Sequence, residues 1–237
     1  MYRLGLLACD FVPEHLRDRF EDYPSMFATA IASAEVEVEW EVYQVYNGQL
    51  PESIDECDGY ITTGSRSGAY DEDVWIVRLE QFIQDLVGSQ RRLVGMCFGH
   101  QIIAQALGAQ VGKSSKGWGI GIQHNAIGSG VDAAWMDPSL QQFTIPVCHQ
   151  DQVMSLPEGA RLIASNPHCE YFMILFNDTM LGLQGHPEFD PSYIQVVLDE
   201  RRKIITGAVR EDAVRSLTRD HDNARIMKWI ANFLGIR

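Results

Sequence analysis

The segment Val94-Gly95-Met96-Cys97-Phe98-Gly99-His100-Gln101 is the one that decides how this chain folds. It has the form G-x-C-x-G and lies between an apolar run at 92–96, typical of a buried strand, and a helical pattern at 98–107 that stops before Gly108. Glycines two residues on either side of Cys97 permit a sharp strand-to-helix turn without side-chain clashes. The segment therefore predicts a nucleophile elbow with cysteine in place of serine.

Such an elbow gives Cys97 the surroundings of a nucleophile. The turn lifts the sulfur above the carboxyl ends of the strands and places it at a helix N-terminus, where the thiolate is favoured over the thiol. The amide N–H of Phe98 then becomes one donor to an oxyanion. The alternative interpretation of the segment is a buried structural cysteine beside packing glycines.

A thiolate nucleophile needs a base, and the base needs a group that orients it. The segment Gln184-Gly185-His186-Pro187-Glu188-Phe189 supplies both, directly after an apolar strand pattern at 180–183. Residues two apart point the same way from an extended backbone, so Glu188 can reach the far ring nitrogen of His186. The strand-end position also puts His186 on the same sheet edge as Cys97. We therefore predict a triad of Cys97, His186 and Glu188.

Short apolar runs alternate with helical patterns through the first half of the chain. Strands are predicted at 2–9, 36–45, 59–63 and 92–96, and helices at 24–34, 74–87 and 98–107. This alternation implies an α/β fold with a mostly parallel central sheet flanked by helices.

The second half has a different pattern. Short strand patterns between 110 and 184 predict a mixed or antiparallel extension of the same sheet, and helices are predicted at 191–206 and 221–234. No domain boundary is evident. We therefore expect one α/β domain over residues 1–237, with a helical C-terminal extension that starts near residue 190.

Composition and charge exclude several classes of protein. The 237 residues carry a formal net charge of −13, and an acidic surface repels phosphate backbones, so we expect no nucleic-acid partner. No apolar run reaches the ~18 residues that a spanning helix needs, so we expect no membrane association. The five cysteines are odd in number and irregularly spaced, which favours a cytoplasmic protein. The sequence contains no CxxC pair, so we expect no metal site. We interpret all but one as buried and structural: Cys9, Cys57, Cys148 and Cys169.

Taken together, the elbow segment and Gly185-His186-Pro187-Glu188 resemble the class I, or triad, glutamine amidotransferases. The resemblance is to the domain found in GMP synthetase and to its free-standing relatives, including the plant-type γ-glutamyl peptidases. It extends over roughly residues 2–189. It implies the flavodoxin-like class I glutaminase fold.

The resemblance also implies a set of binding residues. The segment Ile61-Thr62-Thr63-Gly64-Ser65-Arg66 is similar to the oxyanion loop of the family, whose amide near Gly64 faces that of Phe98. His149-Gln150-Asp151-Gln152-Val153 resembles a segment whose backbone lines the glutamine pocket, and Gln101 is expected to hold the amino-acid end of the substrate. His149 is a rival for the role of base. We prefer His186 because Glu188 can orient it.

The implied chemistry needs no metal and no organic cofactor. Cys97 attacks the side-chain amide of glutamine to form a thioester, and His186 protonates the departing ammonia and then activates water. The acceptor of the ammonia is not visible, and a separate synthetase chain is one possible partner. The alternatives are a γ-glutamyl peptidase or hydrolase that uses the same triad on γ-glutamyl peptides or amides, and a non-catalytic regulatory or binding module that kept the elbow.

Overall fold

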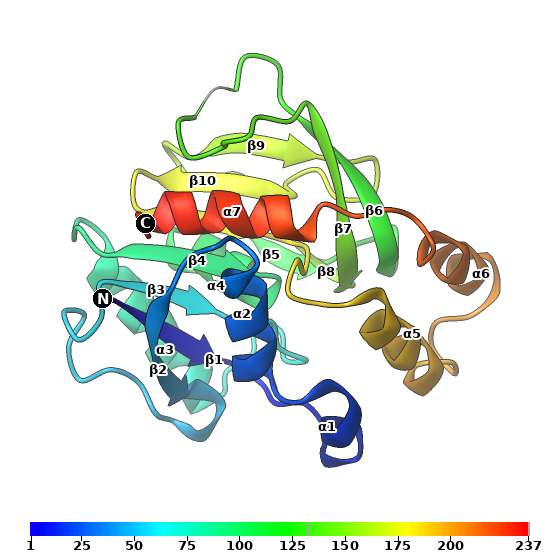
Figure 1. The fold of residues 1–237 in the computed structure, drawn as a ribbon, viewed down its shortest axis with the longest axis horizontal. Coiled ribbons are helices and arrows are strands. Elements are labelled where there is room, and N and C mark those ends of the chain that lie inside the picture. Colours follow the sequence, from blue (N-terminus) through cyan, green and yellow to red (C-terminus); the bar gives the residue numbers. More distant parts are fainter. Residues whose placement is uncertain (132, 237) are drawn as a thin grey trace.

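A nine-stranded sheet runs through the computed structural model, which describes residues 1–131 and 133–236 (Figure 1). One half is parallel, with strands in the spatial order β2 (Val38–Gln44), β1 (Tyr2–Ala8), β3 (Gly59–Thr62), β4 (Arg92–Met96) and β11 (Met180–Leu183). The other half is antiparallel and continues with β10 (Met173–Asn177), β9 (Arg161–Ser165), β6 (Gly119–Ile127) and β7 (Gln142–His149). The predicted α/β class and the antiparallel extension are both confirmed.

Helices cover the two faces of the parallel half. Figure 1 shows α2 (Tyr23–Ala32) and α7 (Asn223–Leu234) on one face, and α3 (Val74–Leu86) and α4 (Phe98–Ala106) on the other. Successive side chains of a strand point to opposite faces. Leu6 of β1 accordingly packs in the core under α2 and α7, whereas Leu7 packs in the core under α3 and α4.

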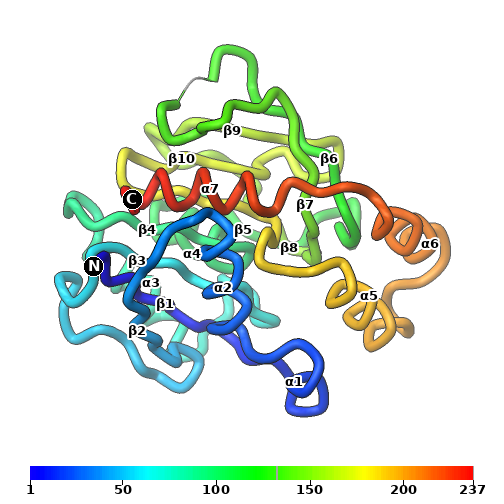
Figure 2. Tube along the Cα trace, viewed as in Figure 1, coloured from blue at the N-terminus to red at the C-terminus, as the bar shows by residue number. Residues whose placement is uncertain are grey.

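A third apolar cluster lies beyond the carboxyl ends of the parallel strands. It joins the loop after β1 to three more helices, α1 (Glu14–Phe20), α5 (Pro191–Glu200) and α6 (Gly207–Ser216), which Figure 2 shows to one side of the sheet. A small sheet of β5 (Val111–Lys113) and β8 (Asp151–Val153) lies near the same end. Within the described parts of the chain, no helix has the length and apolar character needed to cross a membrane.

Helices α1 and α6 are absent from the sequence-based prediction. Each buries little: only Leu16 in α1, and Ala213 and Ser216 in α6, so neither has an apolar stripe that a pattern search could find. The helix predicted at 191–206 was too long, because α5 ends at Glu200 and turns follow. The charged run after Glu200 offers no apolar face, and Ile205 instead turns inward to the third cluster.

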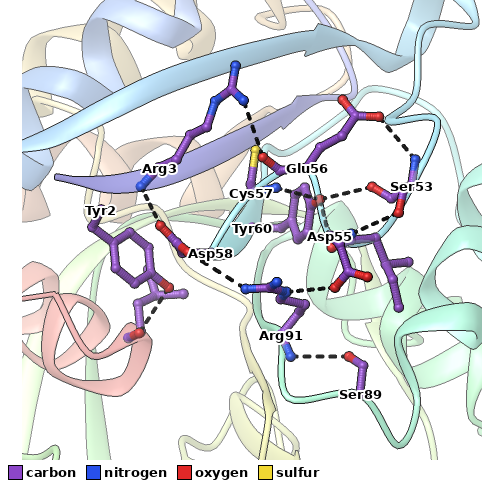
Figure 3. A network of polar contacts seen from close by, with 12 residues as sticks. Tyr2, Arg3, Ser53, Asp55, Glu56, Cys57, Asp58, Tyr60, Ser89 and Arg91 are labelled. Atoms are coloured by element: carbon purple, nitrogen blue, oxygen red, sulfur yellow. Dashed lines mark hydrogen bonds and ion pairs between the residues drawn. The ribbon is translucent and has the colours of Figure 1, made fainter.

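Polar contacts fix the amino ends of the parallel strands, at the edge opposite the elbow (Figure 3). The carboxylate of Asp58, just before β3, accepts the backbone N–H of Arg3 at 2.8 Å and lies 3.6 Å from Arg91, just before β4. Arg91 also pairs with Asp55 at 3.1 Å. One side chain, Asp58, therefore connects the starts of three neighbouring strands.

Replacing Asp58 with alanine should lower the thermal unfolding midpoint by about 2–4 °C, because one hydrogen bond to a strand amide is lost. Asp55→Ala is the matched control, since it removes only an exposed ion pair and should shift the midpoint by less. Differential scanning calorimetry measures both. Equal shifts for the two variants would contradict the role given to Asp58.

Candidate active site

Cys97 occupies the turn between β4 and α4 with a strained backbone. Its φ is 50° and its ψ is −99°, a positive φ at a non-glycine residue, as the elbow requires. Its N–H donates to the carbonyl of Leu183, the last residue of β11, at 2.8 Å. A Cβ at Gly95 would collide with the backbone of Gly99, and one at Gly99 would collide with Thr62, so the turn closes only with glycine at both positions.

His186 and Glu188 follow β11 and form a buried pair. The Nδ1 atom of His186 lies 2.7 Å from Oε1 of Glu188, and both side chains are almost fully buried. The ring stacks on Phe189 with centroids 4.2 Å apart and planes 8° apart. The backbone N–H of His186 donates to the carbonyl of Pro146 at 2.8 Å. Ring and backbone are thus both fixed, and the expected reach of Glu188 to His186 is confirmed.

The electrostatics of this pair favour an imidazolium. Burial alone lowers the pKa of His186, but the negative charges of the Glu188 carboxylate and, after it, of the Cys97 sulfur outweigh burial and raise the pKa to about 10. A protonated ring beside the sulfur stabilises negative charge there, and the N-terminus of α4 acts in the same direction.

The remaining thiols have the opposite environment. Burial raises the pKa of Cys148 to about 11 and that of Cys169 to about 12, and it also raises the pKa of Cys9 and of Cys57. All five cysteines are free thiols. Thiols whose pKa is raised are weak nucleophiles at neutral pH, which leaves Cys97 as the candidate.

Gly64 lies directly against the reacting groups. A Cβ built there would be 2.8 Å from Cε1 of His186 and 3.6 Å from Cβ of Cys97. Phe98 is the first residue of α4, so its N–H has no partner in an earlier helical turn. The two residues that the sequence assigned to the oxyanion therefore both lie next to Cys97, and Ser65, which follows Gly64, is in the cavity wall.

A cavity of about 230 Å³ opens beside Cys97, and five of the predicted binding residues line it: Ser65, Gln101, His149, Gln150 and Asp151. The amide nitrogen of Gln101 is already engaged, since it donates to the Asp151 carbonyl at 2.8 Å. Its side-chain oxygen is the atom left for a ligand. The Asp151 carboxylate accepts from the hydroxyl of Tyr70 at 2.9 Å.

His149 lines this cavity without the features of a base. Its Nδ1 lies 3.2 Å from the carbonyl of Asp151, and no described residue partners its Nε2. Burial, and after it the nearby His168, lower the pKa of His149 to about 3, so the ring is neutral. In contrast to His186, it has no carboxylate partner among the described residues.

Gln184 is a contact of the nucleophile that the sequence reasoning missed. Its amide nitrogen donates to the sulfur of Cys97 at 3.4 Å, and its side-chain oxygen accepts from Gln101 at 3.1 Å. Gln184 lies two residues before His186, so strand alternation could have pointed to it.

A second cavity, of about 120 Å³, lies against Cys97 and His186. It is bounded by Asp10 and Phe11 after β1, by Tyr23 of α2, and by Tyr193 and Arg201 at α5. The sequence assigned no role to any of these residues, because they belong to no motif. Within the described residues, no cluster of three or more histidine, cysteine or acidic side chains could hold a metal ion.

A family model and several known proteins are similar to this chain. The family model described as "Glutamine amidotransferase class-I" matches residues 20–199. γ-Glutamyl peptidase 3 of Arabidopsis thaliana is 30% identical over 98% of this chain and 96% of its own length. One component of the glutamine-hydrolysing GMP synthase of Archaeoglobus fulgidus is 31% identical over 45% of this chain and 57% of its own length. A crystal structure of a glutamine amidotransferase from Thermotoga maritima has the same fold, with a TM-score of 0.76, 19% identity and 99% of each chain covered.

Replacing Glu188 with glutamine should lower the pKa of His186 from about 10 toward its ordinary value, because the carboxylate that favours the imidazolium is gone. NMR titration of ¹⁵N-labelled histidine measures this, with His149 as the internal reference that stays neutral. Folding raises the pKa of His186, so the protonated ring beside Glu188 stabilises the folded state. This stabilisation is complete below pH 6.5 and is lost as the pH rises through about 10. An unchanged His186 titration in the variant would contradict the pairing.

Substitution of Gly64 by alanine should reduce turnover by about 10²-fold or more, because the added methyl displaces the His186 ring and misplacement of reacting groups is costly. Gly112→Ala is the matched control, since no atom of the described residues lies within 4 Å of a Cβ built there. Steady-state kinetics of both variants provide the comparison. Full activity in Gly64→Ala would remove Gly64 from the site.

Proposed function

The chain belongs to the class I glutamine amidotransferase family, and we propose that it is a cysteine amidase that cleaves the side-chain amide of glutamine or of a γ-glutamyl compound. The observation that carries this proposal is the strained Cys97 beside the buried His186–Glu188 pair. A nucleophile, a proton donor and an orienting carboxylate are the groups that this reaction needs.

In the proposed first step, the sulfur of Cys97 attacks the amide carbonyl. The backbone N–H groups near Gly64 and of Phe98 hold the oxyanion. The C–N bond then breaks as the imidazolium of His186 gives its proton to the departing nitrogen, which leaves a γ-glutamyl thioester. Because Glu188 and the Cys97 sulfur together outweigh burial and raise the pKa of His186 to about 10, the ring carries that proton at neutral pH.

In the second step, His186, now neutral, takes a proton from water, and the resulting hydroxide attacks the thioester. Glutamate leaves and the sulfur of Cys97 is regenerated. One water is consumed in each cycle and no cofactor is used. Glu188 orients the ring and does not transfer the proton itself, so its loss costs less than that of Cys97 or His186.

We assign the 230 Å³ cavity to the γ-glutamyl part of the substrate. The Asp151 carboxylate and the side-chain oxygen of Gln101 suit an ammonium group, and the backbone around His149 and Gln150 completes the wall. Ser65 closes the cavity next to Cys97. This assignment makes the amino-acid end of the substrate the part that is recognised by charge.

The fate of the amine distinguishes two versions of the function. In an amidotransferase, ammonia passes to an acceptor, and a separate synthetase chain is the partner that we propose for that case. A γ-glutamyl peptidase acting on γ-glutamyl peptides is the second candidate, favoured by the 98% coverage of this chain by γ-glutamyl peptidase 3 of Arabidopsis thaliana. Five free thiols support the cytoplasm as the compartment.

We further propose that residues 1–237 work as one domain of this family. The helices beyond residue 190 contribute to the site, since Tyr193 and Arg201 line the second cavity. The C-terminal extension is then part of the enzyme and not an appendage.

Cys97→Ser should keep the fold and lose at least about 10³-fold in release of ammonia or amine, because a hydroxyl is far harder to deprotonate. Cys169→Ala is the control, since Cys169 is buried away from both cavities and should retain activity. Circular dichroism checks the fold. Turnover is assayed with glutamine and with γ-glutamyl peptides.

A diazo-ketone analogue of glutamine tests the same assignment without an acceptor. It should label Cys97 alone, as seen by peptide mass spectrometry. Near wild-type turnover in Cys97→Ser, or labelling of a different cysteine, would refute the proposed mechanism.

A further inference from the structure

Two cavities meet at the sulfur of Cys97. Both are lined by Arg66, Cys148 and Arg201, but His186 lines only the smaller one. When the sulfur adds to an amide carbonyl, the carbonyl carbon becomes tetrahedral, and its acyl chain and its leaving nitrogen point away from it in different directions. Because the leaving nitrogen must receive its proton from His186, it must point into the smaller cavity. The acyl group then occupies the larger one.

The smaller cavity has aromatic walls. Phe189 stacks on His186 and lies 4.6 Å from the ring of Tyr193 and 6.1 Å from that of Tyr23. On the other side, Phe11 is 41% exposed, and the guanidinium of Arg66 lies 4.8 Å from its centroid. Ammonia gains nothing from such walls, whereas an amine with an apolar or aromatic side chain does.

The charges around this cavity leave one guanidinium unneutralised. Asp10 is buried and takes a bidentate ion pair from Arg66, at 2.6 and 2.8 Å, and Glu200 pairs with His15 at 2.6 Å. Arg201 has no carboxylate within ion-pair distance among the described residues. It lies 5.0 Å from the ring of Trp118 and donates to the sulfur of Cys148 at 3.3 Å.

A fixed guanidinium without a counter-ion attracts a carboxylate on the ligand. The α-amine of an amino acid carries such a carboxylate two bonds away from the nitrogen. It also carries a side chain that could reach the aromatic walls. The cavity volume, about 120 Å³ and open at its rim, is close to the ~150 Å³ that holds a benzene ring in other proteins.

We propose that the smaller cavity is a leaving-group subsite for an α-amino acid with an aromatic or large apolar side chain. Phe11, Tyr23 and Tyr193 contact the side chain, and Arg201 contacts the carboxylate. The preferred substrate is then a γ-glutamyl amino acid or peptide of this kind and not glutamine. This inference rests on the proposed attack of Cys97 on a γ-glutamyl amide.

The test compares kcat/KM for four substrates: glutamine, γ-glutamyl-glycine, γ-glutamyl-phenylalanine and γ-glutamyl-phenylalaninamide. We expect γ-glutamyl-phenylalanine to exceed glutamine and γ-glutamyl-glycine by about tenfold or more. The neutral phenylalaninamide should be poorer than the free acid. If glutamine or γ-glutamyl-glycine is cleaved as well as γ-glutamyl-phenylalanine, the subsite is refuted while the proposed function stands.

The Phe11→Ala variant tests whether the smaller cavity causes the preference for γ-glutamyl-phenylalanine. It should lower the ratio of kcat/KM for γ-glutamyl-phenylalanine to that for γ-glutamyl-glycine by about three- to tenfold. Ile204→Ala is the matched control, because Ile204 is an exposed apolar residue that lines neither cavity, and it should leave the ratio unchanged. In Arg201→Gln, the difference between the acid and the amide should disappear. An unchanged ratio in Phe11→Ala would overturn the assignment.

Binding to the Cys97→Ser variant tests the subsite without turnover. Isothermal titration calorimetry should give a Kd for γ-glutamyl-phenylalanine at least about tenfold below that for glutamine. Selective binding together with no turnover of any amide by the wild type would reject the proposed function and retain the subsite. Equal affinity for the two ligands would reject the subsite.

Discussion

The hydrogen bond from the N–H of Cys97 to the carbonyl of Leu183 extends the parallel pairing of β4 and β11 by one residue. In that pairing, Met96 lies opposite Leu183, so the elbow and the His186 segment leave the sheet side by side. Two segments far apart in the chain thereby deliver a sulfur and an imidazole to the same edge. A shift of this register by one residue would send His186 to the other face and separate the pair.

A buried ion pair is costly to form, and the one between His186 and Glu188 is almost fully removed from water. One carboxylate oxygen of Glu188 has no hydrogen-bond partner among the described residues, so the negative charge of Glu188 is balanced mainly by the His186 ring. Stability alone does not explain such an arrangement, since an apolar pair of similar volume is often as stable. The arrangement does explain a ring that stays protonated at neutral pH, as the proposed proton transfer to the departing amine requires.

The candidate catalytic residues could be predicted from the sequence more fully than the residues that line the cavities around them. Cys97 and its glycines, His186 and Glu188 lie in short segments whose spacing reflects strand and helix geometry, so local rules place them. Gln184 could have been found by the same alternation. Tyr193 of α5 and Arg201, directly after α5, could not be predicted, because the packing of α5 over the site depends on tertiary contacts with α1 and β6 and not on any local pattern. Helices α1 and α6 escaped prediction for a related reason, since each buries too few residues to leave a periodic signal.

The two cavities at Cys97 are built from different kinds of segment. The cavity that we assign to the acyl group is built at the strand ends and the elbow, and the sequence motifs that form it also carry the residues of the proposed reaction. The smaller cavity is built from the loop after β1 and from α2 and α5, elements whose sequence is not constrained by the chemistry. Such elements can vary while Cys97, His186 and Glu188 remain in place. Under the proposed leaving-group subsite, the loop after β1 and the packing of α2 and α5 therefore select the amine that leaves, whether ammonia or an amino acid.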